Sequence, residues 1–221
     1  MSIRKLIFTN DQIYHIYNRG VEKRTIFESK SDYQRALTTF CYYQRSNLPL
    51  RLSHFLNLNQ EERDKFDPKK YPELVDIISF CLMPNHFHLL VKQLADNGVK
   101  TFISNFSNSY SRYFNLKHNR SGHLLQGTFK AVWVEDDNQL IQVSHYIHLN
   151  PVASFLIKEA EIFSFQWSSA SEYVSKNNNG ICNKKLVLDY YKNVDEYKKS
   201  LIFHAKKLRA IQESDKLLID K

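Results

Sequence analysis

Glycine, proline and cysteine are all scarce in this chain of 221 residues. Five glycines and five prolines argue against long linkers and against a repeat-rich all-β chain. The cysteines are Cys41, Cys81 and Cys182, an odd number, and none has a second cysteine at metal-ligand spacing. This usage predicts a reducing compartment, the cytoplasm.

Long apolar runs are missing as well. No stretch approaches the roughly 18 apolar residues that are needed to span a bilayer. The N-terminal sequence MSIRKLIFTN lacks the apolar segment of a signal peptide. We therefore expect a soluble cytoplasmic protein with no membrane partner.

Positive charge and aromatic rings, in contrast, are abundant. The formal net charge is +8, and the chain contains 13 Tyr, 15 Phe and 2 Trp. A basic balance favours polyanionic partners, because protein cations release the counterions of phosphates. Aromatic rings among lysines and arginines suit stacking on unpaired bases, although most of the phenylalanines are expected in the core. Since 43% of the residues are hydrophobic, the chain can bury the core of one ordinary domain.

The first part of the chain predicts a strand, a helix and an insertion. Residues 12–18 are rich in β-formers and stop before a glycine, which predicts a strand. Residues 31–45 begin with cap-forming side chains and carry apolar residues at helical spacing. Residues 46–73 are polar and contain three prolines, so we interpret them as an insertion with a short helix around 59–66.

The middle of the chain predicts a β-hairpin followed by a helix. Residues 74–82 form an apolar, β-branched run, and residues 86–93 form the returning strand beyond the turn signal Pro84-Asn85. Residues 98–118 carry an aromatic stripe at helical spacing, which is typical of a helix packed on a core.

The last part predicts one more strand and two helices. Residues 128–134 have the composition of a strand. Residues 136–150 have helical periodicity, and we expect Pro151 to stop this helix because a proline pushes the residue before it out of the α region. Residues 194–218 predict a charged helix with an apolar stripe.

This order of elements predicts an α+β fold with a ferredoxin-like antiparallel sheet and helices on one face. We expect one domain over residues 1–175, in which 46–73 is the insertion. Residues 176–221 would then form a C-terminal helical extension.

The first chemical motif is His86-Phe87-His88 at the start of the returning strand. Residues i and i+2 of a strand point to the same face, so the two imidazoles project together while Phe87 faces the core. Two imidazoles at this distance can share one metal ion. Histidines at this spacing also occur by chance on exposed strands, so the interpretation as a metal site depends on the residues around the pair.

The second motif is Tyr146-Ile147-His148-Leu149-Asn150. Tyr146 and Asn150 are four residues apart and share a helix face. The hydroxyl of the tyrosine and the amide oxygen of the asparagine could approach one hard divalent cation from this helix. The alternative is that Tyr146 packs and Asn150 caps the helix end.

Three segments in the same order resemble one family. CLMPNHFHLLV, GHLLQGTFK and HYIHLNPVA are similar to segments of the REP-associated tyrosine transposases, which are single-tyrosine HUH (His-hydrophobe-His) transposases. The early segment YHIYNRGVEKRTIF and the later FQWSS also fit the family pattern, so the resemblance runs from about residue 12 to 173. One departure is Thr128, where the family often has an arginine.

The resemblance implies a fold and an activity. It implies the HUH endonuclease fold and cleavage of single-stranded DNA through a 5′-phosphotyrosine intermediate that leaves a free 3′-OH. On matching positions Tyr146 would be the nucleophile, and His86, His88 and Asn150 would hold the metal. The expected metal is Mg²⁺ or Mn²⁺, since both suit phosphoryl chemistry. The partner would be single-stranded or hairpin DNA, and a homodimer is one expected assembly.

Basic and amide side chains near these motifs are candidates for DNA contact. They are Arg19, Arg24, Arg112, Arg120, Gln126 and Lys130.

Three alternatives stay open at this stage. Tyr110 or Tyr113 could be the nucleophile, although neither has a ligand-type residue four positions later. A non-catalytic single-stranded nucleic-acid-binding protein could use the same basic, aromatic-rich fold. A zinc hydrolase or a histidine-triad enzyme is disfavoured, because the triad would need a histidine where Leu90 stands and no acidic residue adjoins the pair.

Overall fold

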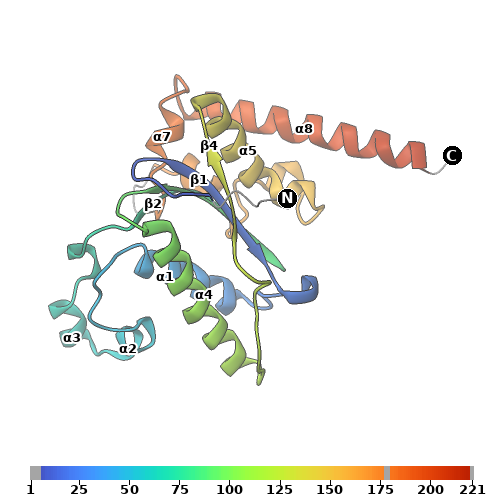
Figure 1. The fold of residues 1–221 in the computed structure, drawn as a ribbon. Coiled ribbons are helices and arrows are strands. Elements are labelled where there is room, and N and C mark those ends of the chain that lie inside the picture. The colour runs from blue at the N-terminus through green and yellow to red at the C-terminus, as the bar shows by residue number, and fades with distance from the viewer. Residues whose placement is uncertain (1–5, 177–179, 220–221) are drawn as a thin grey trace.

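The computed structural model describes residues 6–176 and 180–219. Its centre is a four-stranded antiparallel sheet with the strand order β2-β3-β1-β4 (Figure 1). The strands are β1 (Ile13–Arg19), β2 (Val75–Met83), β3 (His86–Gln93) and β4 (Lys130–Val134). With the helices α1 (Lys30–Tyr43) and α4 (Gly98–Lys117) between them, the element order is the β-α-β-β-α-β of ferredoxin-like folds. The predicted α+β class and antiparallel sheet are confirmed.

One face of the sheet, here called the first face, is covered by α1 and α4. Alternate residues of the strands point to this face, as the two-residue period of a strand requires. The aromatic stripe predicted on residues 98–118 packs against them, so its role in the core is confirmed. The fully buried members of this cluster include Ile16, Phe40, Phe80, Phe87, Phe102, Phe106, Tyr110 and Phe114.

The opposite, second face is covered by α5 (Asp137–Ala153) and by the C-terminal part of the chain. That part contains α6 (Ala170–Val174), α7 (Lys185–Leu188) and the long α8 (Val194–Ile219). The expectation of helices on one face therefore describes α1 and α4 but is incomplete. Cys81, Leu90 and Val134 point apolar side chains to the second face. These side chains must also be buried away from water, so helices cover the second face as well.

The predicted stop at Pro151 is wrong. Helix α5 continues through Pro151 to Ala153. A proline so close to the C-terminal end removes few helical hydrogen bonds, and the chain beyond it stays helical because Val152 is fully buried in the second-face core. The N–H of Ser154 donates to the carbonyl of Asn150 (3.0 Å) and completes the last turn.

The insertion predicted at 46–73 forms a small lobe beside α1 and α4 (Figure 1). It holds α2 (Leu52–Asn57), α3 (Gln60–Lys65) and the 3₁₀ turn Pro68–Lys70. The short helix expected around 59–66 is confirmed as α3, and α2 adds a second one. Two further 3₁₀ turns lie at Val21–Lys23 and Glu159–Glu161.

The predicted extension 176–221 shares the second-face core. Tyr197, Leu201 and Ala205 of α8 are fully buried there together with residues of α5. Residues 177–179, 220 and 221 of the extension lie outside the described residues, and the boundary at 175 stays a prediction. In the part of the chain that is described, no helix has both the length and the apolar character for crossing a membrane.

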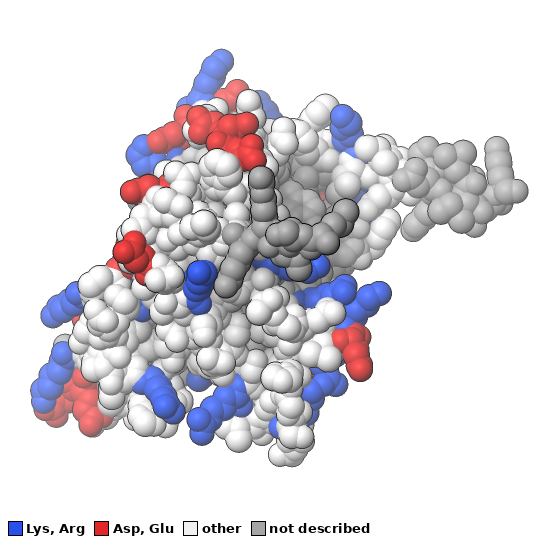
Figure 2. All heavy atoms as spheres, viewed as in Figure 1, with Lys and Arg blue, Asp and Glu red and all other residues white. Residues whose placement is uncertain are grey.

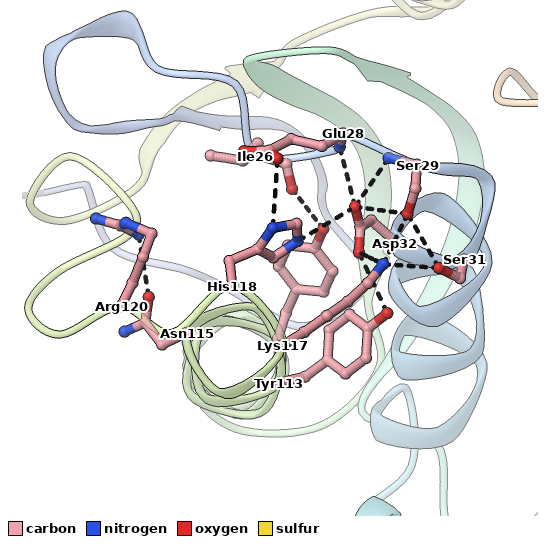
Figure 3. Close-up of polar contacts among 11 residues, drawn as sticks. Ile26, Glu28, Ser29, Ser31, Asp32, Tyr113, Asn115, Lys117, His118 and Arg120 are labelled. Carbon is pink, nitrogen blue, oxygen red and sulfur yellow. Dashed lines mark hydrogen bonds and ion pairs between the residues drawn. The ribbon is translucent and has the colours of Figure 1, made fainter.

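Asp32 fastens the start of α1 to the end of α4 on the first face (Figure 3). Its buried carboxylate accepts hydrogen bonds from the N–H groups of Glu28 (3.0 Å) and Ser29 (2.9 Å) and from the Lys117 ammonium (2.7 Å). Burial by itself raises the pKa of Asp32, but these hydrogen bonds outweigh it and lower the pKa overall.

Candidate functional site

A group of polar side chains lines the second face of the two central strands. In the antiparallel register Tyr17 lies opposite His88, and Arg19 lies opposite His86. Phe87 and Leu89 point to the first-face core, so His86 and His88 both point to the second face, as the sequence predicts. Their ring centroids are 5.1 Å apart.

A third histidine, His15, belongs to the same group and was not predicted. His15 lies on β1, two residues before Tyr17 and on the same face. Its Nε2 is 2.9 Å from Nδ1 of His88, a hydrogen-bonding distance, and the two rings are stacked. The only sequence signal for His15 is its place in the early YHIYNRG segment, because its contact with His88 depends on the register between β1 and β3.

Helix α5 carries Tyr146 and Asn150 to this face of the sheet. Half of the Tyr146 surface is exposed, and its ring meets those of His88 (5.5 Å) and His15 (5.8 Å) edge to face. The amide nitrogen of Asn150 donates to the carbonyl of Tyr146 (3.0 Å). Asn150 also lies close enough to His86 for its side chain to act on the pKa of that imidazole. The predicted shared face of Tyr146 and Asn150 is confirmed.

The three imidazoles are held in their neutral form. Burial lowers the pKa of His15 to about 4. Burial also lowers the pKa of His88, to about 3, and the neighbouring His15 and His86 add to this shift. Burial lowers the pKa of His86 too, and this outweighs the Asn150 side chain, which acts to raise it. At pH 7 all three are therefore unprotonated, which is the form that binds a metal ion.

The donor set fits a divalent cation only when the amide oxygen is included. Among the described residues no three His, Cys, Asp or Glu side chains are grouped to hold a metal. His88 uses Nδ1 for His15, and His86 uses Nδ1 for Asn85 Oδ1 (2.6 Å), so each keeps Nε2 as the ring nitrogen for a ligand. Asn150 lies close enough to His86 to act on its pKa, which places three neutral donors in one region. Such a set leaves coordination positions for phosphate and water oxygens.

Three of the predicted DNA-contact residues surround this cluster. The Arg19 guanidinium donates from Nε to Oε1 of Gln126 (2.6 Å), and the Gln126 N–H donates to the Arg19 carbonyl (2.8 Å). Lys130 on β4 is paired with Tyr17 and is exposed. Arg19 is close enough to lower the pKa of His86 by charge repulsion, although burial is the larger cause.

The other predicted contacts lie elsewhere. Arg24 is exposed just after the turn that follows β1. Arg120 follows α4 and donates to Oδ1 of Asn115 (3.0 Å; Figure 3). Arg112 projects from α4 into a groove on the other side of the sheet, so the structure does not bring it to the histidine cluster.

The two competing tyrosines lie on α4, across the sheet from the histidines. Tyr110 is fully buried, and its hydroxyl donates to the Ile26 carbonyl. The Tyr113 hydroxyl donates to Asp32 (3.2 Å; Figure 3). Neither hydroxyl lies near His86 or His88.

The remaining histidines near Tyr146 point away from it. His148 is buried between α5 and α8, with Nδ1 2.6 Å from the Tyr197 hydroxyl and Nε2 2.7 Å from the Ser169 hydroxyl. His145 bonds the Tyr191 hydroxyl (2.9 Å). His148 is therefore not part of the histidine cluster beside Tyr146. His123 is exposed in the loop after α4.

Comparison with known proteins bears on this site. Residues 57–150, which contain the HFH motif, Tyr146 and Asn150, match the family model described as "Transposase IS200 like". A search of curated proteins found no match. The solved structure of a REP-associated tyrosine transposase bound to a REP hairpin is similar, with a TM-score of 0.55 and 12% identity. The match covers 80% of this chain and 87% of that one. At this identity the structural match shows a common fold, and the two findings together confirm the family resemblance.

Proposed function

We propose that this chain is a metal-dependent enzyme that nicks and rejoins single-stranded DNA at hairpin or palindromic sequences. The observation that carries the proposal is the position of Tyr146. Its half-exposed ring lies against His15 and His88, and it shares one helix face with Asn150. The family match over residues 57–150 adds support.

In the proposed reaction the Tyr146 hydroxyl oxygen attacks a backbone phosphorus. A tyrosine–phosphate ester forms at the 5′ end, the bond from phosphorus to the 3′ oxygen breaks, and the tyrosine proton is given up while the 3′ oxygen gains one. The ester keeps the energy of the broken bond, so a 3′-OH can reverse the step and rejoin DNA without ATP. A phenol with an ordinary pKa near 10 is a weak nucleophile at pH 7, so its position beside the phosphate must supply much of the rate.

His86, His88 and Asn150 would hold Mg²⁺ or Mn²⁺ in this proposal. Bound there, the ion would neutralise charge on the scissile phosphate and orient it for in-line attack. His15 would be a positioning residue, because its ring nitrogen is bonded to Nδ1 of His88 and fixes which His88 nitrogen faces the ligand.

The basic residues beside the cluster would guide the DNA. Arg19, Gln126 and Lys130 would contact phosphates close to Tyr146, and Arg24 and Arg120 would contact phosphates further along the strand. The solved relative is bound to a REP hairpin, and we extend a hairpin partner to this chain as part of the proposal. A homodimer and a cytoplasmic location stay predictions.

Covalent capture on denaturing gels tests the proposal. The protein is mixed with labelled hairpin oligonucleotides from both strands of the DNA flanking its gene, with Mn²⁺ or with EDTA. We expect a covalent adduct that forms with Mn²⁺, not with EDTA, and that is lost in Tyr146→Phe. Tyr190→Phe is the matched control, since Tyr190 is a similarly exposed tyrosine (46%) outside the cluster.

An adduct that survives Tyr146→Phe would contradict the assigned nucleophile. Hairpin binding with no adduct on either strand would instead favour the non-catalytic single-stranded nucleic-acid-binding protein.

A further inference from the structure

A second basic feature lies on the side of the sheet away from Tyr146. It is a groove of about 1220 Å³ between α4 and the segment 45–57, which contains α2. We call it the α4 groove. Its lining contains five lysines and arginines and no aspartate or glutamate: Arg35, Arg45, Arg51, Arg112 and Lys117.

The α4 groove is long rather than round. Its α4 wall runs from Thr101 through Asn105 and Arg112 to Lys117, a stretch of about 24 Å at 1.5 Å per residue. Small-molecule sites are mostly apolar and enclose their ligand. A long wall of cations, amides and hydroxyls suits an extended polyanion better.

Two of the cations are free to bind an outside anion. Arg51 and Arg112 are both exposed, and among the residues described no carboxylate pairs with either of them. Arg35 lies over the Tyr113 ring (5.1 Å), and its Nε is buried with no hydrogen-bond partner in the described structure.

The other two cations are fixed in place by carboxylates behind them. Arg45 is bound to Glu73 (2.6 Å). Lys117 is bound to Asp32 (2.7 Å), in the polar cluster that joins α1 to α4 (Figure 3). Each of these pairs is electrically neutral, so within the described residues the uncompensated positive charge of the groove comes from Arg35, Arg51 and Arg112, while the two pairs fix the shape of its wall.

The surface charge agrees with this arrangement. In the view of Figure 2, only blue side chains occur along the bottom of the molecule, where Figure 1 places the end of α4. The red side chains of this view lie at the upper left, at the lower left edge and on the right side of the molecule.

The aromatic rings of the groove are already occupied. Tyr113 is covered by Arg35 (5.1 Å) and Lys117 (5.8 Å). Tyr43 packs against Tyr42, and its hydroxyl accepts the Leu52 N–H (3.2 Å). Single-stranded DNA is usually held by bases stacked on free aromatic rings. A groove that offers phosphate contacts without such rings suits a paired stem.

We propose that the α4 groove binds the sugar-phosphate backbone of a double-stranded DNA stem. The inference rests on the proposed function, since the stem would belong to the hairpin whose unpaired flank reaches Tyr146. The insertion 46–73 would then be the second wall of a stem-binding site, and Arg112 contacts DNA remote from the histidine cluster.

Fluorescence anisotropy tests the groove with a labelled DNA hairpin whose stem is about 12 base pairs, slightly more than one helical turn. Arbitrary sequence suffices because backbone contacts do not read bases. The test variant is Arg51→Gln with Arg112→Gln. The matched control is Lys206→Gln with Lys207→Gln, which removes the same charge from exposed positions of α8.

The groove variant should lose two phosphate contacts. The slope of log K against log salt should fall by about 1.8, and the affinity should drop about 60-fold at 0.1 M salt. The control and Tyr146→Phe should bind the hairpin as the unmodified chain does. All variants should keep the same melting temperature, since exposed arginines contribute little to folding.

Three results would overturn the proposal that the α4 groove binds a DNA stem. They are equal hairpin affinity in the groove and control variants, an equal loss in both, and tighter groove-dependent binding of an RNA hairpin of the same sequence.

The same experiments separate this inference from the proposed function. Hairpin binding that depends on the groove, without any covalent adduct, would support stem binding in the groove and contradict the nicking activity. A covalent adduct that depends on Tyr146, with hairpin binding that does not depend on the groove, would support the nicking activity and contradict stem binding in the groove.

Discussion

Removing the ring nitrogen of His15 should weaken metal binding while leaving the fold intact. The substitution is His15→Phe, which keeps a flat ring between Tyr17 and Tyr146. If His88 binds a cation through Nε2, its Nδ1 must carry the proton, and His15 Nε2 at 2.9 Å is the acceptor for that proton. In the phenylalanine variant this N–H has no acceptor.

The size of the effect follows from burial. His88 is only 6% exposed, so water cannot readily replace the lost acceptor. A buried donor without a partner costs about 1–3 kcal/mol. This cost applies to the His88 tautomer that binds metal, because that tautomer carries its proton on Nδ1. The other tautomer has no N–H at Nδ1 and loses no acceptor. The expected result is a metal Kd raised about 10- to 100-fold.

Isothermal titration of the protein with Mn²⁺ measures this directly and needs no DNA. His15→Gln should restore most of the affinity, since its amide oxygen can accept the same proton. His123→Phe is the control, a histidine removed from an exposed loop. Nitrogen-15 NMR of His88 in the metal-free protein should show Nδ1 protonated in the unmodified chain.

Unchanged Mn²⁺ affinity in a folded His15→Phe variant would refute the role of His15. A loss that His15→Gln does not restore would point to packing rather than to the hydrogen bond.

Three further predictions concern stability. Asp32→Asn should lower the free energy of unfolding by about 3 kcal/mol at pH 7. The pKa of Asp32 is lowered in the fold, so the stability that this carboxylate contributes is present above about pH 4 and is lost as the pH falls further. Urea unfolding between pH 7 and 3 should therefore show the two proteins converging in acid, and parallel curves would contradict the assignment. Gly98→Ala should destabilise by about 1–3 kcal/mol, since its Cβ would lie 2.2 Å from the Leu74 carbonyl oxygen; an unchanged melting temperature would show that α4 can shift away. Ser169→Ala should cost about 2 kcal/mol in the same urea assay, because it removes the partner of the Phe80 N–H (2.8 Å) and of His148 (2.7 Å), and a loss under 0.5 kcal/mol would argue that neither bond matters.

The sequence predicts well where the information is local. The hairpin of β2 and β3 follows from an apolar run, a Pro-Asn turn and a second apolar run. The common face of His86 and His88 follows from the period of a strand. The common face of Tyr146 and Asn150 follows from the period of a helix.

The sequence predicts poorly where two distant segments must meet. His15 and His88 are 73 positions apart, and only the strand register brings them together. Arg112 shows the same limit, because a helical pattern does not tell which side of the sheet its polar face will occupy. Pro151 shows another, since the burial of Val152 outweighs a local helix-stopping signal.

The hydrogen bond between His148 and Tyr197 has a consequence for the order in which the protein is made. The two residues are 49 positions apart, so a ribosome has synthesised every motif of the site before it reaches Tyr197. Until then His148 lacks one of its two buried partners, and α5 lacks the helix it packs against. The tyrosine proposed to cut DNA thus reaches its final support only after α8 has been synthesised, well after the motifs of the site themselves.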